Sequence, residues 1–215
     1  MAKKQINPTR MELTRIKRKL VTAKRGHKLL KDKRDELMRQ FLEMVRVNKV
    51  LRENAERGLQ VATQNFALAR ASMSEETMET ALLIPSCEVY MEAREKNITS
   101  VVVPQFEIKL RTADESDIYS YGLAFTGIDL DIAIKSLNDV LPDLLKLAEV
   151  EKSCQLIAME IEKTRRRVNA LEYILIPEMQ ENIKFITMKL DENERSTQIR
   201  LMKVKDMILA ETHSY

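Results

Sequence analysis

Residues 13–55 read LTRIKRKLVTAKRGHKLLKDKRDELMRQFLEMVRVNKVLRENA, and this stretch decides the fold. Mostly apolar residues recur along it at alternating steps of three and four positions, which is a seven-residue repeat. A strict repeat of this kind predicts a helix that supercoils left-handed around a partner helix. The predicted seam comprises Leu13, Ile16, Leu20, Ala23, His27, Leu30, Arg34, Leu37, Phe41, Met44, Asn48, Leu51 and Ala55, and less regularly Ala62, Phe66, Ala69 and Met73.

A second repeat of the same period begins after Gly127. Its members are Leu130, Ala133, Leu137, Val140, Leu144, Leu147, Val150, Cys154, Ile157, Ile161, Thr164, Val168, Leu171 and Leu175, and then, less regularly, Asn182, Ile186, Leu190, Leu201, Val204 and Ile208. Pro142 and Pro177 interrupt this pattern, and we expect them to bend the helix rather than end it. Because the two repeats are similar in length and a short segment joins them, the simplest pairing is an antiparallel coiled coil within the chain.

Between the two repeats the period changes to that of a strand. Apolar and polar residues alternate from Val89 to Ala93, Glu95–Asn97 is suited to a turn, and Ile98–Val103 is rich in β-branched residues. This pattern predicts a short β-hairpin. The segment Gln105–Tyr121 has no periodicity and is predicted to be a loop.

The predicted fold class is therefore mainly α. It is a long antiparallel two-helix coiled coil of the N- and C-terminal helices, with a short β-hairpin and loop insert in the middle. The three predicted parts are the first helix in residues 1–84, with a candidate break near 72–74, the insert in residues 85–125, and the second helix in residues 126–215.

Charge is distributed unevenly along the chain, although the net charge is only +3. Met1–Glu36 contains 13 Lys or Arg against 4 Asp or Glu, a net charge of +9. Ser74–Ser120 contains 4 against 10, a net charge of −6. A basic end of this kind suits nucleic acid, an anionic membrane surface or an acidic protein cavity, and charge alone ranks none of these first.

Cysteine usage and hydropathy indicate a reduced, cytosolic compartment. Cys87 and Cys154 lie in unrelated contexts, so they predict neither a disulfide nor a metal site. No apolar run approaches the length of about 20 residues that spans a bilayer. The basic N-terminal stretch also lacks the apolar region of a secretory signal. We therefore expect a peripheral protein without direct membrane insertion.

Catalytic apparatus is not visible in the sequence. The four glycines, Gly26, Gly58, Gly122 and Gly127, are isolated, and none begins a phosphate-binding loop. His27 and His213 are the two histidines, and neither has a second metal ligand at helical spacing. The expectation is a non-catalytic protein with no cofactor and no metal.

Polar residues within the predicted seams invite two interpretations. Arg34, Asn48, Thr164 and Asn182 more often fix the register of a coiled coil than contact a partner. Residues 163–167 read KTRRR, and successive helical residues fan out around the helix, so these cations form a ring of charge. A solvated surface and a partner-binding surface both account for that ring.

Three stretches closely resemble one known family. Residues 7–15 read NPTRMELTR, residues 26–37 read GHKLLKDKRDEL, and residues 144–176 read LLKLAEVEKSCQLIAMEIEKTRRRVNALEYILI. These resemble the D subunit of the V-type and archaeal-type (A-type) rotary ATPases, in the form found in bacteria and archaea. The resemblance extends over nearly the whole chain.

The resemblance implies a non-catalytic rotor of the central stalk, which couples ATP hydrolysis or synthesis to transport of H⁺ or Na⁺. In the family, the paired terminal helices enter a hexameric head of alternating catalytic A and non-catalytic B subunits. The middle of the chain binds the small F subunit of the stalk, and the lower end sits on the funnel-shaped subunit that caps the membrane ring. The expected location is the cytoplasmic side of the membrane, as a peripheral part of the complex.

Candidate contact residues follow from charge and from the family-like stretches. The candidates for head contacts are Arg10, Arg15, Arg25, Lys28, Arg165, Arg166 and Arg167, and those for the F subunit are Val45, Val50, Leu59 and Phe66. Two alternatives to a rotor are a structural coiled-coil scaffold and a nucleic-acid-binding protein that uses the basic N-terminal region. The low aromatic content, 5%, disfavours base stacking, so we expect no nucleic acid among the partners.

Overall fold

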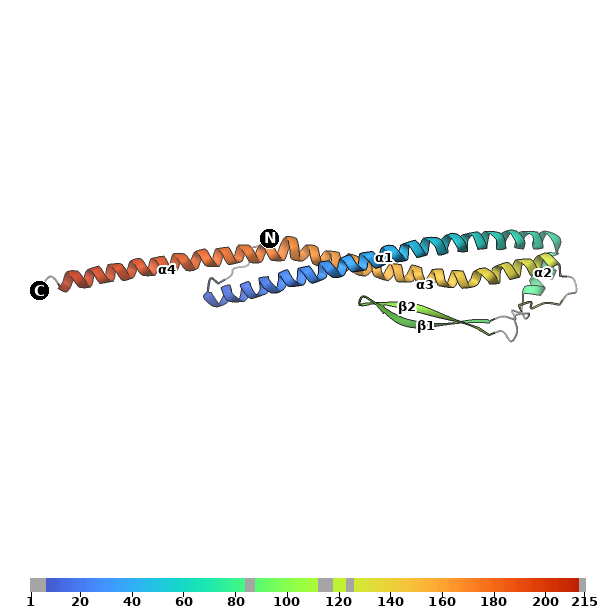
Figure 1. Ribbon diagram of the computed structural model, residues 1–215, viewed down its shortest axis with the longest axis horizontal. Coiled ribbons are helices and arrows are strands. Elements are labelled where there is room, and N and C mark those ends of the chain that lie inside the picture. The colour runs from blue at the N-terminus through green and yellow to red at the C-terminus, as the bar shows by residue number, and fades with distance from the viewer. Residues whose placement is uncertain (1–6, 84–87, 112–117, 123–125, 213–215) are drawn as a thin grey trace. The chain divides into compact units, whose positions relative to one another are not determined.

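The computed structural model describes residues 7–83, 88–111, 118–122 and 126–212, and helices dominate it (Figure 1). The elements in chain order are α1 (Arg10–Ser72), α2 (Glu75–Leu82), β1 (Glu88–Ile98), β2 (Val101–Arg111), α3 (Ile128–Ala170), the π-helical segment η1 (Leu171–Leu175) and α4 (Ile176–Thr212). The mainly α fold class, with paired terminal helices and a central antiparallel hairpin, is confirmed.

The chain is organised into two compact units. Unit 1 comprises Met1–Arg34 and Lys163–Tyr215, and unit 2 comprises Asp35–Glu162. Helices α1 and α3 contribute to both units, and α4 belongs to unit 1.

In unit 1, the start of α1 pairs with the helical chain that follows residue 163. Arg10 forms an ion pair with Glu194, and His27 Nε2 lies 3.3 Å from Glu172 Oε2. From Arg10 to His27 the residue number on α1 rises, while the number of the facing residue falls from Glu194 to Glu172. The two helical segments are therefore antiparallel. The side chains buried here fall on the predicted seams and include Ile16, Thr164, Val168 and Ile186.

In unit 2, the rest of α1 pairs antiparallel with α3. Arg52 Nη1 lies 3.7 Å from Glu151 Oε1, and Asn65 Nδ2 donates to Ser136 Oγ at 3.4 Å. Seam residues Leu37 and Ile157 are fully buried. Burying apolar area between the helices is the main source of their stability, because isolated helices are marginal in water.

Two predicted seam residues of unit 2, Phe66 and Leu137, are exposed, so their assignment was wrong. Asn65 and Ser136 occupy the inward positions instead, and their side chains hydrogen-bond to each other. On α1, Asn65 continues the regular spacing from Ala62 to Ala69, and Phe66 departs from it. On α3, Ser136 lies one position before the predicted Leu137. The neighbouring seam residue Ala69 is small and fully buried, which agrees with close spacing of the two helices.

Helix α2 closes the far end of the α1–α3 pair. Ser74 caps it, since its Oγ accepts a hydrogen bond from the Thr77 backbone N–H at 3.3 Å. Buried Met78 of α2 packs with Ala69 of α1 and Leu130 of α3 in one apolar cluster.

The hairpin pairs β1 with β2 in a continuous antiparallel register that runs from Glu88↔Arg111 to Ile98↔Val101. The connection is the two residues Thr99 and Ser100, so the predicted turn at Glu95–Asn97 was wrong. The prediction of a loop from Gln105 was also wrong as far as Arg111, because β2 continues to that residue. The polar residues Glu95–Asn97 suggested a turn, but they lie on the exposed strand β1.

The helical path continues across both internal prolines. Pro142 lies inside α3, and Pro177 is the second residue of α4, which begins directly after η1. A proline has no N–H to donate and its ring crowds the preceding turn, so the wider π-helical turn accommodates it. The π turn adds one residue to the local repeat, which leaves Leu175 exposed although the heptad placed it in the seam.

Candidate partner-binding surfaces

The titratable groups with raised pKa values have structural explanations rather than catalytic ones. Burial raises the pKa of the Tyr121 hydroxyl, which donates to Asp131 Oδ1 at 2.6 Å. Burial also raises the pKa of the Cys154 thiol, which makes it a poor nucleophile. Across the described ranges, no group of three or more His, Cys, Asp or Glu side chains is placed to hold a metal ion.

The seven cationic candidates for head contacts all fall in unit 1, and all are exposed. Arg10, Arg15, Arg25 and Lys28 lie on α1, and Arg165, Arg166 and Arg167 lie on α3. Of these, Arg10 pairs with Glu194, and Arg15 Nη1 lies 3.4 Å from Glu12 Oε2.

The run Arg165–Arg167 faces outward because of the seam residues on either side of it. Thr164 and Val168 are each 1% exposed, which fixes the rotation of the helix at this point. The three residues between them span an arc of about 200°, since successive helical residues are about 100° apart. The arginines therefore spread around the outer side of α3 rather than forming one stripe.

The structure does not gather the seven cations into one patch. Glu194, the partner of Arg10, lies 27 residues after Arg167, which corresponds to about 40 Å along the helical path at about 1.5 Å per residue. Arg10 and Arg15 thus belong to one end of unit 1, and the Arg165–Arg167 run belongs to the other. A single partner must extend along this length to contact both groups.

The four candidates for contact with the F subunit lie on α1 within unit 2. Val45, Leu59 and Phe66 are spaced at multiples of seven and share one helix face. Val50 lies about 140° around the helix from Val45, since each residue adds about 100°. A flat partner that covers the first three does not reach Val50.

Sequence reasoning missed a second apolar stripe on α1. Val47, Val61 and Leu68 are also spaced at multiples of seven, and all three are exposed, with Val50 close to their line. The signal was present as a second heptad series outside the seam. It was overlooked because the seam alone accounted for the helix.

The end of α4 was also misassigned. Leu201, Val204 and Ile208 were placed in the seam, but each is more than half exposed. Because Arg10 begins α1 and contacts Glu194, the described part of α1 offers no partner to the later turns of α4. We call the exposed apolar residues of this helix end the α4 end surface. Its members are Ile199, Leu201, Met202, Val204, Met207, Ile208 and Leu209.

The α4 end surface surrounds the helix instead of forming one stripe. At about 100° per residue, Ile199, Val204, Leu201 and Leu209 point in four different directions around the axis. Charged residues lie between them, namely Arg200, Lys203, Lys205 and Asp206, so this end of the helix is mixed in character. Several exposed apolar side chains grouped in this way mark a candidate surface for contact with another protein. No helix in the described part of the chain has the length and hydropathy required to span a bilayer.

Comparisons with known proteins agree on one family. The family model for the ATP synthase D subunit matches residues 12–206. A V-type ATP synthase D subunit from Acetivibrio thermocellus is 57% identical over 215 residues, covering 100% of this chain and 97% of that protein. A V-type ATP synthase D subunit from Clostridioides difficile is 59% identical, covering 97% of this chain and 94% of that protein. Another, from Clostridium novyi, is 54% identical and covers 100% of both chains.

Proposed function

Because this chain belongs to the family of ATP synthase D subunits, we propose that it is the central-stalk rotor of a V/A-type rotary ATPase. In this role it has no active site. It transmits rotation between ATP hydrolysis or synthesis in the head and movement of H⁺ or Na⁺ through the membrane ring. The antiparallel pairing of the terminal helices in both units supports this role most directly, because two helices with interlocked seams resist twisting better than one.

The proposed partner in the head is the hexamer of A and B subunits. The exposed cations of unit 1 supply contacts that can be exchanged at modest cost as the rotor turns, since exposed ion pairs contribute only about 0–1 kcal/mol each. The α4 end surface supplies a different contact. Because its apolar residues point in all directions, its site in the head must enclose the helix.

In the proposed assembly, unit 2 carries the remaining partners. The small F subunit of the stalk contacts the face of α1 that contains Val45, Leu59 and Phe66, two of which are exposed apolar residues. The funnel-shaped subunit contacts the end formed by α2. The whole protein then lies on the cytoplasmic side as a peripheral part of the complex.

Coupling in this proposal arises from differential binding. Each angular position of an asymmetric rotor favours a different conformation of the surrounding catalytic subunits, and the differences in contact free energy drive their exchange. A rotor therefore changes the rate of ATP hydrolysis, whereas a static scaffold changes only assembly.

A reversible cross-link tests this proposal. The complex is assembled from the A, B and F subunits, this chain and the membrane sector, with cysteines introduced at an exposed position of unit 1, such as Arg15→Cys, and at the facing head surface. A rotor predicts that disulfide formation stops ATP hydrolysis and ion transport, and that reduction restores both. If turnover continued with the disulfide formed, this chain would be a static scaffold.

A further inference from the structure

The turn of the hairpin adopts a backbone conformation that its residues disfavour. Thr99 has φ 47° and Ser100 has φ 71°, and these are the two described non-glycine residues with positive φ. Two-residue hairpin turns of this kind normally use Asn-Gly or Gly-Gly, because an L residue with a Cβ is strained there. A β-branched threonine is a particularly unfavourable choice. The turn is therefore held in place by contacts outside it.

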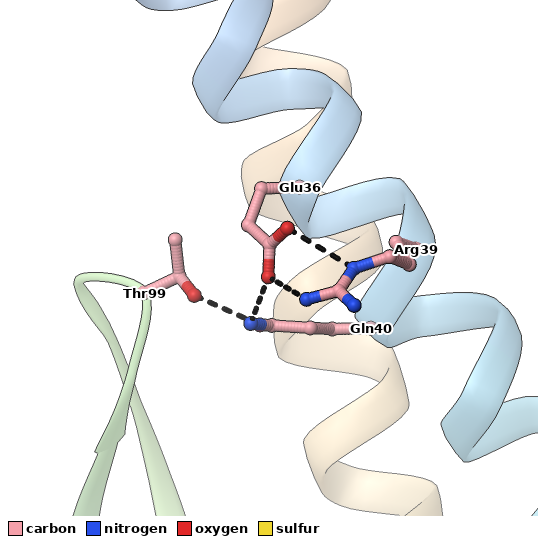
Figure 2. A network of polar contacts seen from close by, with 4 residues as sticks. All are labelled: Glu36, Arg39, Gln40 and Thr99. Carbon is pink, nitrogen blue, oxygen red and sulfur yellow. Dashed lines mark hydrogen bonds and ion pairs between the residues drawn. The ribbon is translucent and has the colours of Figure 1, made fainter.

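A chain of hydrogen bonds connects this turn to α1 (Figure 2). Thr99 Oγ1 donates to Gln40 Oε1 at 2.8 Å, and Gln40 Nε2 donates to Glu36 Oε1 at 2.8 Å. Arg39 donates twice to the same carboxylate, from Nη2 at 2.7 Å and from Nε at 3.1 Å. The hydrogen bond from Arg39 also holds the pKa of Glu36 below its usual value.

This network fixes which way the Gln40 amide points. Its nitrogen is committed to Glu36, so its oxygen is directed at the Thr99 hydroxyl. A second contact lies within the turn itself, where the Ser100 backbone N–H donates to Asn97 Oδ1 at 3.0 Å. The hydrogen bond between Thr99 and Gln40 joins the hairpin to the helix pair, whereas the one between Ser100 and Asn97 stays within the hairpin.

The apolar contact between the hairpin and the helices lies on both sides of the turn, because partly buried Ile98 of β1 packs against a cluster that includes two buried residues of β2. Val101 and Val103 are buried in a cluster with Leu37 of α1 and with Ile157 and Ile161 of α3.

The remainder of the hairpin is held more loosely. On β1, every residue from Glu88 to Asn97 is exposed. Further along β2, the Phe106 backbone N–H donates to Glu149 Oε2 of α3 at 3.0 Å. The hairpin is thus attached to the helices mainly near its tip.

We propose that the hairpin tip is a reversible latch. The hairpin detaches from α1 and α3 as one piece while the helix pair stays closed, and the contact between Thr99 and Gln40 sets the fraction of time for which it stays attached. Detachment exposes Val101 and Val103, which opposes release, but it also frees the turn to relax, which favours release. These opposing effects make the attached state easier to open than the helix seam.

Thiol labelling of the full-length chain tests the latch, and the native Cys154 provides the reference. Cys154 is buried in the seam between α1 and α3, so it reacts only when the helices separate. With Cys87 replaced by serine, Val103→Cys places a second thiol at a position that is 2% exposed. The latch predicts that a maleimide labels the introduced thiol at least tenfold faster than Cys154 in the same molecule. Equal rates would mean that the hairpin opens only with the helix pair, and would overturn the proposal.

A substitution at the turn tests the role of the hydrogen bond. Thr99→Val keeps the β-branched shape and removes the hydroxyl, so it should speed labelling of the introduced thiol about fivefold and leave Cys154 unchanged. Gln40→Met should do the same, and the double variant should show no further acceleration, because both changes remove one contact. Additive effects would show that the two side chains act separately. Thr187→Val, an exposed threonine in unit 1, is the matched control and should change neither rate.

Hydrogen exchange on the unaltered chain guards against a perturbation caused by the introduced cysteine. The Phe106 N–H is bonded to α3 rather than to β1, so it is protected only while the hairpin is attached. It should exchange faster than the amides of α3 around Ile157. If it exchanged together with those helical amides, the hairpin would not detach separately.

Discussion

At Gly58 on α1, an added Cβ would lie 2.4 Å from Cγ2 of Val140 on α3. Valine is stiff about its first side-chain torsion, so it cannot easily turn away. Overpacking usually costs about 1–3 kcal/mol, so after the helix-propensity gain of about 1 kcal/mol we expect Gly58→Ala to lower the free energy of unfolding by up to about 2 kcal/mol. Urea unfolding followed by circular dichroism measures the difference.

Gly26 provides the matched control, because it is also in α1 and no atom lies within 4 Å of the Cβ that alanine would add. Gly26→Ala should therefore raise the free energy of unfolding by up to about 1 kcal/mol through helix propensity alone. The double variant Gly58→Ala with Val140→Ala should recover part of the packing loss. Equal stabilisation by the two single glycine substitutions would show that α1 and α3 have room to move apart at Gly58.

Residue identity predicted most of the seam but not the shift at Asn65 and Ser136. The heptad rule assigns large apolar residues to the interior, which favoured Phe66 and Leu137 over their polar neighbours. The spacing between the helices decides otherwise, and that spacing depends on small residues contributed by both helices. On α1 the regular spacing from Ala62 to Ala69 already pointed to Asn65, whereas on α3 the spacing pointed to Leu137.

At the scale of elements, the π-helical segment η1 links a proline in the sequence to a widened turn in the helix. Pro177 lies two residues after the end of η1 and has no N–H for the turn before it. We expect Pro177→Ala to convert η1 to regular α-helix and to raise the thermal midpoint by several degrees, since proline within a helix costs about 3 kcal/mol. Thermal unfolding by circular dichroism measures the midpoint, and backbone chemical shifts of Leu171–Leu175 report the conversion.

Pro142 offers a comparison for that substitution. It lies inside α3 and has no π-helical segment attached to it. Pro142→Ala should also raise the midpoint but should leave the chemical shifts of η1 unchanged. If Pro177→Ala left η1 π-helical, the cause of the wide turn would be packing within unit 1 rather than the proline.

The hairpin shows where prediction from local sequence ended. Strand alternation correctly indicated two β-strands, but the turn was placed at Glu95–Asn97, where Asn97 is of a residue type that favours turns. The observed turn uses Thr99 and Ser100 with positive φ, for which the sequence offers neither the glycine nor the Asn-Gly pair that such turns favour. Its position is set by the docking of Val101 and Val103 on the helices and by the bond to Gln40, which are contacts distant in sequence.

For the whole molecule, the proposed role requires exchangeable charged contacts in unit 1. Replacing Arg165, Arg166 and Arg167 with alanine should weaken binding to the purified head about tenfold at low salt, if each exposed contact contributes about 0.5 kcal/mol. Replacement with lysine should keep most of the affinity, because the charge is retained. Binding measured at two salt concentrations separates the electrostatic part, since salt screens exposed charges. Unchanged affinity of the alanine variant would remove these arginines from the interface.

The α4 end surface makes the strongest demand on a partner, because its apolar side chains are largely exposed. Met202, Val204 and Ile208 are 65%, 51% and 54% exposed, so replacing all three with serine should leave the thermal midpoint of the isolated chain unchanged. Affinity for the head should fall at least about a hundredfold, because burying each such side chain is worth about 1.5–3 kcal/mol.

The matched control for that variant is Val61→Ser with Leu68→Ser, on the exposed stripe of α1 in unit 2. It removes similar apolar area and should not change head affinity. Equal losses from both variants would indicate a general effect of surface hydrophobicity. A selective loss from the α4 variant would show that the head encloses this helix end, so that the rotor's tightest contact is apolar and encircling while its charged contacts lie further along unit 1.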